Sequence, residues 1–198
     1  MDGNVEFSLN NPGKNIAIPD RINDLITAVY RMHTLDPWKL GRERSEYFEN
    51  VFRKRMSGWP IRNQTDPEYG HATTIAFLLH PGYHMGIATR DGLEVLLNRL
   101  GGQCFMSLLE ISHVGPFARV RFTLETLNGT DRRLTYAESE SPFREKDNEF
   151  FEILKRVLEE EEIEILPLEL LECPVPDVRL MITEAGCATI YHCLFDEE

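Results

Sequence analysis

Three histidines lie close together in the chain and form its only histidine cluster: His71, His80 and His84. His80 and His84 flank the turn-forming pair Pro81-Gly82 between two apolar runs, so we expect their side chains to converge. Three imidazoles can hold zinc, and imidazole also suits iron or nickel. The sequence therefore makes His71, His80 and His84 candidate metal ligands.

The same spacing also has a plain structural interpretation. The histidines do not form the i, i+4 pair of a helical zinc-protease motif, and no acidic residue stands between His80 and His84 to act as a base. In that interpretation His80 ends a strand and His84 lies in the turn. An enzyme site here would instead need a nearby carboxylate, such as that of Glu68 or Glu110.

Other catalytic motifs are absent from the sequence. It contains no phosphate-binding loop ending in Gly-Lys-Ser or Gly-Lys-Thr, no Gly-x-Gly-x-x-Gly and no Gly-x-Ser-x-Gly. We therefore expect no cofactor, apart from the divalent metal that the three histidines would bind.

Aromatic and basic side chains share a long polar loop over residues 57–72. Trp59, Arg62 and Tyr69 have the composition of a protein-binding hot spot. Loops of this length are usually functional or mobile. We interpret the three residues as a candidate partner-binding surface; the alternative is that the tryptophan folds back onto the core.

The charge is strongly acidic and unevenly distributed. The net charge is −12 and the sequence pI is near 5.0, which argues against nucleic acid or an anionic membrane surface as partner. Residues 39–62 are rich in lysine and arginine, whereas residues 159–198 hold twelve acids against the single base Arg179. Three interpretations remain: the regions neutralise each other within the fold or across a dimer, the acidic region binds a basic partner, or both are merely solvated.

The four cysteines and the first residues indicate the compartment. We expect Cys104, Cys173, Cys187 and Cys193 to be free thiols in a reducing cytoplasm. His192 adjoins Cys193, but neighbours in a strand point to opposite faces, so this imidazole is badly placed to activate the thiol. The chain opens without the basic and apolar segments of a signal peptide, and no apolar run approaches the roughly 18 residues of a membrane helix.

The order of elements follows from periodicity and turn signals. The first half predicts two helices (19–35 and 41–56), strands at 73–79 and 83–88, and a helix at 89–100 with a leucine stripe. The clearest signal is the alternation from Ala118 to Glu125. The Asn128-Gly129 turn and a returning strand at 133–138 complete it as a hairpin.

The remainder predicts a further strand at 104–111, a helix opening at Ser141-Pro142, and three tail strands at 163–171, 178–183 and 188–195. Without regular strand–helix–strand alternation, we predict an α+β fold: a mainly antiparallel sheet with about four helices packed on it, two of them N-terminal. Residues 1–18 are expected to form an N-terminal arm and residues 19–198 a single domain.

Three classes of function remain. We rank first a non-enzymatic, acidic, cytoplasmic module that binds another protein, in the manner of an inhibitor, an immunity factor or a dedicated chaperone. The second is an enzyme with a site, metal-dependent or not, around His71, His80 and His84. The third is a homo-oligomeric structural subunit that associates through the hairpin edge or the tail strands.

Overall fold

The computed structural model describes residues 16–34, 37–66, 71–84, 90–127, 134–178, 180 and 187–196. Most of the predicted arm, residues 1–18, lies outside this part of the chain. Among the described residues, no helix is long and apolar enough to span a bilayer. The helices are α1 (Asp20–Ile26), the π-helical turn η1 (Thr27–Arg31), α2 (Pro37–Arg55), α3 (Arg90–Arg99), the 3-10 turn η2 (Glu145–Asp147), α4 (Asn148–Glu160), α5 (Leu168–Leu171) and α6 (Ile190–Leu194).

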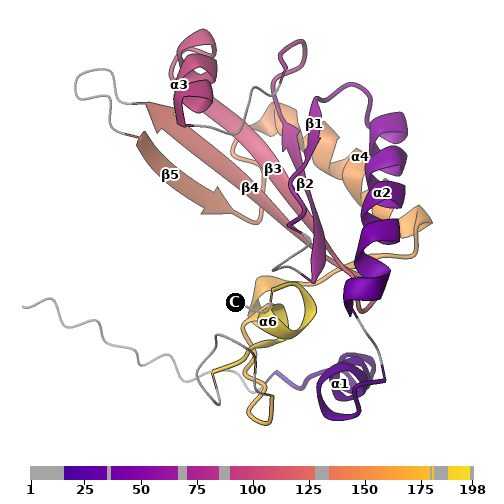
Figure 1. Ribbon diagram of the computed structural model, residues 1–198. Coiled ribbons are helices and arrows are strands. Elements are labelled where there is room, and N and C mark those ends of the chain that lie inside the picture. Colours follow the sequence, from indigo (N-terminus) through magenta and orange to yellow (C-terminus); the bar gives the residue numbers. More distant parts are fainter. Residues whose placement is uncertain are drawn as a thin grey trace, which may run out of the picture.

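Five strands form an antiparallel meander in which each strand pairs with the next along the chain (Figure 1). They are β1 (Ile61–Asn63), β2 (Ala72–Leu78), β3 (Gln103–Ser112), β4 (Phe117–Leu127) and β5 (Leu134–Ser139). A two-residue strand, β6 (Glu164–Ile165), pairs in parallel with the first residues of β4. The predicted α+β class with a mainly antiparallel sheet is confirmed.

Helices α2 and α4 cover one face of the sheet (Figure 1). Period-2 alternation sends Ile75, Leu109 and Val120 to this face, where they meet Phe52 of α2 and Phe150 of α4 in the main core. We call the opposite side the polar face. Helix α3 lies over one end of it, where Leu97 packs on buried residues of β2 and β3.

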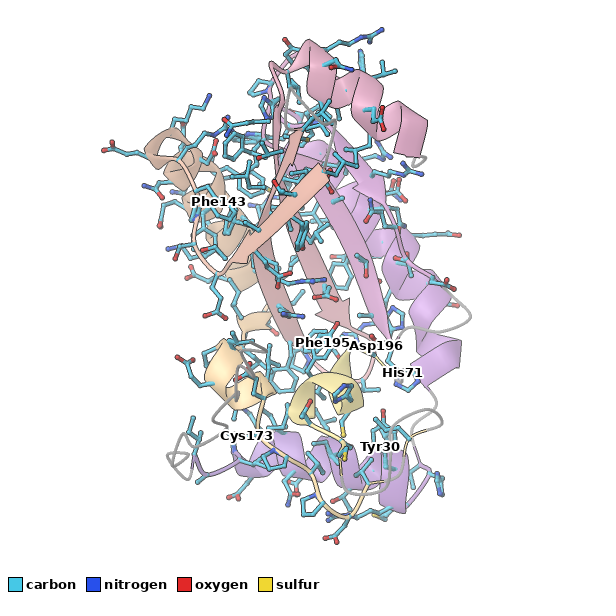
Figure 2. The ribbon with its side chains drawn as sticks, turned by 90° about the vertical axis from the view of Figure 1, so that its left-hand side faces the viewer. Tyr30, His71, Phe143, Cys173, Phe195 and Asp196 are labelled. Atoms are coloured by element: carbon cyan, nitrogen blue, oxygen red, sulfur yellow. The ribbon has the colours of Figure 1, made fainter. Side chains whose placement is uncertain are left out.

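A second apolar cluster lies at the other end of the sheet. There the N-terminal segment α1–η1 packs with α5, α6 and the start of β4, with Ile22, Phe117 and Leu194 among its buried residues. The side chains of this region are seen in Figure 2, where Tyr30 and His71 lie next to each other.

Several predicted boundaries are wrong for identifiable reasons. The loop 57–72 contains the short strand β1 and the first residue of β2. The helix expected from Ser141-Pro142 begins only at Asn148, after the 3-10 turn η2. The expected strand 163–171 is confined to Glu164–Ile165, because Pro167 leads into the short helix α5. Tyr83 and His84 are not in a strand, and residues 85–88 lie outside the described part.

The predicted C-terminal strand at 188–195 is a helix, α6. Thr189 is its N-cap, and the pair Thr189–His192 forms a capping box, with the backbone N–H of Thr189 donating to His192 Nδ1 at 3.1 Å. Because histidine stands where this motif usually has glutamate or glutamine, the sequence pattern does not reveal where the helix begins.

Candidate functional site

The structure separates the three histidines that the sequence grouped. His71 precedes β2 and His80 follows it, so the two lie at opposite ends of the strand. At about 3.3 Å per residue, nine residues place them roughly 25–30 Å apart, too far to share an ion. His84 is exposed beyond the turn. Within the described ranges, no group of three or more His, Cys, Asp or Glu side chains is arranged to hold a metal.

His71 belongs to a buried junction between three segments. Its Nδ1 lies 3.1 Å from the hydroxyl of Tyr30, and that hydroxyl donates to the carbonyl of Cys193 at 2.9 Å. Because a carbonyl can only accept, the single hydroxyl proton of Tyr30 is used there, and the hydrogen toward His71 comes from Nδ1. The imidazole thus ties η1 and α6 to the sheet.

His113 extends the same junction. Its Nε2 lies 3.1 Å from Thr73 Oγ1, and Arg44 donates to the carbonyls of Ser112 and His113 at 3.2 and 2.8 Å. Burial, followed by the effects of His71 and Arg44, lowers the pKa of His113 to about 4. His113 is therefore neutral at physiological pH, and its ring packs against Gly41.

His80 accepts a hydrogen bond of 3.1 Å from the backbone N–H of Phe105 through Nε2. Burial lowers its pKa to about 4, with the cations Arg144 and Lys146 adding to the shift and Asp147 opposing it. The contacts of His80 and His113 give both rings a structural role in this fold.

Of the predicted partner-binding residues, Trp59 and Arg62 lie on opposite sides of the sheet. Trp59 is half-buried, with its ring edge-on to Phe150 at 5.3 Å on the side of the main core. Arg62 of β1 pairs with Ala76 and therefore points to the polar face. Tyr69 lies outside the described residues.

The acidic run at the end of α4 meets the basic helix α2. Arg55 forms an ion pair with Glu160, and Tyr47 donates a hydrogen bond of 2.6 Å to Glu161. Arg21 likewise pairs with Glu164 of β6. Part of the charge asymmetry is thus compensated within the fold.

Four charges form a closed ring on the polar face, which we call the ion-pair ring. Arg119 and Arg121 stand two residues apart on β4, between Glu110 of β3 and Glu138 of β5. Each arginine contacts both carboxylates: Arg119 at 3.6 and 3.2 Å, and Arg121 at 3.2 and 3.2 Å. Nε of Arg121 is not aligned with Glu110 Oε2 as a hydrogen bond, so this contact is Coulombic.

Two tyrosines complete the ion-pair ring. Tyr136 donates to Glu138 at 2.9 Å, and Tyr191 of α6 donates to Glu110 at 3.0 Å while its ring lies 4.7 Å from the guanidinium of Arg119. Deep burial of Tyr191 and partial burial of Tyr136 raise the pKa of both phenols, and the neighbouring carboxylates raise it further. Burial alone would lower the pKa of Arg121, but Glu110 and Glu138 outweigh it and the pKa is raised. The guanidinium of Arg121 is therefore held in its charged form by the two carboxylates.

Two polar groups beside the ion-pair ring have no hydrogen-bond partner in the described part of the chain: Glu125 Oε2 and Thr123 Oγ1. Both belong to β4 and point to the polar face, with Cys104 opposite Glu125 on β3. Burial raises the pKa of Glu125 and also that of Cys104, the latter to about 12.

Sequence reasoning missed the ion-pair ring although part of its signal is visible. The alternation over 118–125 puts Arg119 and Arg121 on one face, and the predicted hairpin brings Glu138 to the neighbouring strand. Tyr191 had no such signal, because its segment was predicted as a strand.

Comparisons with known proteins identify no relative: no protein-family model, no curated protein and no solved structure matches this chain.

Proposed function

We propose that the chain is a non-enzymatic protein-binding module and that the polar face around the ion-pair ring is its recognition surface. The carrying observation is the arrangement of Arg119, Arg121, Tyr136 and Tyr191 on one face of an antiparallel sheet, each fixed by a carboxylate. Arginine and tyrosine are the residue types that dominate binding energy at protein interfaces.

The rigidity of these side chains supports the proposal. Strands and the capped helix α6 carry them, and ion pairs or hydrogen bonds already fix their rotamers. Side chains that are ordered before association lose little conformational entropy on binding, so more of the contact energy appears as affinity.

The charge of the molecule supports a partner with a basic surface. The ion-pair ring itself is neutral, with two arginines against two glutamates, but the whole chain carries −12. A charge of this size speeds the approach of a basic partner, and the ring then supplies the oriented contacts.

The test is affinity capture from the native host followed by calorimetry with each captured protein. Arg121→Lys keeps the charge but removes the planar fork that contacts two carboxylates. Arg53→Lys is the matched control, because Arg53 is half-exposed and, within the described part of the chain, forms its ion pair with Glu49 of its own helix. We expect Arg121→Lys to weaken binding about tenfold or more, and Arg53→Lys to change it by about twofold or less.

Two results would contradict the proposal. One is the absence of any specific partner that binds at micromolar concentration. The other is a partner whose affinity falls equally for Arg53→Lys and Arg121→Lys, because its binding would then not depend on the polar face. Circular dichroism of each variant verifies that the fold is retained.

A further inference from the structure

β5 is an edge strand. It pairs with residues 122–127 of β4, whereas β6 pairs with residues 117–118 on the same side of β4. Within the described ranges, nothing pairs with the outer side of β5. An edge strand presents backbone N–H and C=O groups that accept another strand unless the sequence prevents it.

The two edges of the sheet differ in protection. β1 has three residues, follows Pro60 and carries Arg62; short length, proline and a charged side chain all block strand addition. β5 has six residues, Leu134-Thr-Tyr-Ala-Glu-Ser139, with no proline and no basic residue. Its pairing with β4 runs without a bulge from end to end.

Charge indicates which kind of strand β5 accepts. Glu138 is the only charged residue of the strand, and Arg119 and Arg121 already hold its carboxylate. β5 therefore presents no unpaired carboxylate that would attract a basic partner strand. Two copies of the chain can meet there without placing bare charges opposite each other, despite their net charge of −12.

We infer that β5 pairs antiparallel with β5 of a second copy, about a two-fold axis at Tyr136. Residues opposite each other in such a pair lie on the same face of the sheet. This register sets Tyr136 against its symmetry mate and Thr135 against Ala137. Tyr136 is 57% exposed, the most exposed aromatic side chain among the described residues. Pairing buries the two phenol rings as a cross-strand aromatic pair.

The resulting dimer has one continuous sheet, and both ion-pair rings lie on the same side of it. This inference stands on the edge geometry alone and does not require the partner proposed above. The two proposals share Tyr136, which the dimer would bury, but this test uses only the purified chain, so its failure is distinguishable from failure of the partner proposal.

The first test is disulfide trapping in a background with Cys173 and Cys187 changed to serine, because Cys104 and Cys193 are buried. At a two-fold axis, Tyr136→Cys places two Cα atoms about 4.5–5.5 Å apart, within disulfide range. Ala137→Cys is offset by two residues from its mate, beyond about 7 Å, and is the register control. Tyr47→Cys controls for random collision, because Tyr47 is 53% exposed on α2.

We expect covalent dimers from Tyr136→Cys and monomers from both controls. Equal cross-linking at Tyr47, or preferential cross-linking at residue 137, would overturn the pairing about Tyr136. So would the absence of cross-linking at residue 136.

The second test leaves the cysteines in place and measures sedimentation from about 1 to 100 μM. Tyr136→Lys sets two like charges directly opposite each other and should weaken dimerisation about tenfold. Tyr47→Lys adds the same charge, removes a similar hydroxyl–glutamate bond and should leave dimerisation unchanged. A wild-type chain that stays monomeric over this range, or equal effects of the two variants, would overturn the inference.

Discussion

The hydroxyl of Tyr191 donates a hydrogen bond of 3.0 Å to Oε1 of Glu110, joining α6 to the middle of the sheet. The same ring lies under the guanidinium of Arg119 at 4.7 Å. One side chain of the C-terminal helix thus contacts both an acid and a base of the ion-pair ring. Tyr191 therefore holds helix α6 against the polar face.

Tyr191→Phe tests this coupling. The ring still packs against Arg119, but the buried carboxylate of Glu110 loses a donor. We expect the free energy of unfolding to fall by about 1–2 kcal/mol, because hydrogen bonds to charged groups are worth more than neutral ones. Urea denaturation measures the change. Tyr83→Phe is the control, since the Tyr83 hydroxyl has no hydrogen-bond partner among the described residues; equal losses would contradict the prediction.

Gly41→Ala tests the packing of the buried histidine junction. A Cβ at position 41 would lie 2.7 Å from Nδ1 and 2.8 Å from Cε1 of His113, closer than side chains tolerate. Overpacking typically costs about 1–3 kcal/mol, against about 1 kcal/mol gained in helix propensity. We expect a net loss of stability in thermal or chemical unfolding. A Cβ at position 58 would have no neighbouring atom within 4 Å, so Gly58→Ala should change the free energy of unfolding by less than about 0.5 kcal/mol.

Acid should destabilise the protein through its buried neutral histidines. The pKa of His113 is about 4 in the folded chain, against about 6.5 when unfolded. Between these values the unfolded chain binds more protons, so stability is full above pH 6.5 and falls as pH drops toward 4. At about 1.4 kcal/mol per pKa unit, His113 contributes up to about 3 kcal/mol of this loss. His80 acts in the same direction.

Two measurements verify the acid effect. Chemical denaturation at intervals from pH 7 to 4.5 gives the loss of stability, and NMR titration gives the pKa of each histidine. A midpoint near 6.5 for His113 in the folded protein would contradict its assignment as a buried neutral group.

Glu162→Gly should stabilise the end of α4. Glu162 has a φ of 58°, and the hydrogen bonds from Glu162 N to Glu159 O and from Ile163 N to Leu158 O form a Schellman motif around it. Glycine adopts this conformation without strain, so we expect a gain of about 1 kcal/mol in unfolding experiments. Glu162→Gln removes the charge but keeps the side chain; if it gains as much as glycine, charge rather than backbone strain limits stability here.

Patterns of residue types within short segments were enough to predict several elements of the fold. Apolar periodicity located α1, α2, α3 and the stripe of α4, and alternation located β4. Together with the turn pair Asn128-Gly129, this alternation was enough to predict the β4–β5 pairing, and the mixture of elements was enough to predict an α+β fold. These features depend on residues near one another in the chain.

Contacts between residues far apart in the chain depend on the three-dimensional fold. His71 and His80 are near in sequence, yet an extended strand carries them to opposite ends of the sheet. Glu110, Arg119, Glu138 and Tyr191 come from four elements and converge only through strand register and the docking of α6. Register depends on pairing across the whole sheet, and the capping box that makes α6 a helix uses an unusual histidine. The residue pattern therefore predicts neither the strand register nor the start of α6.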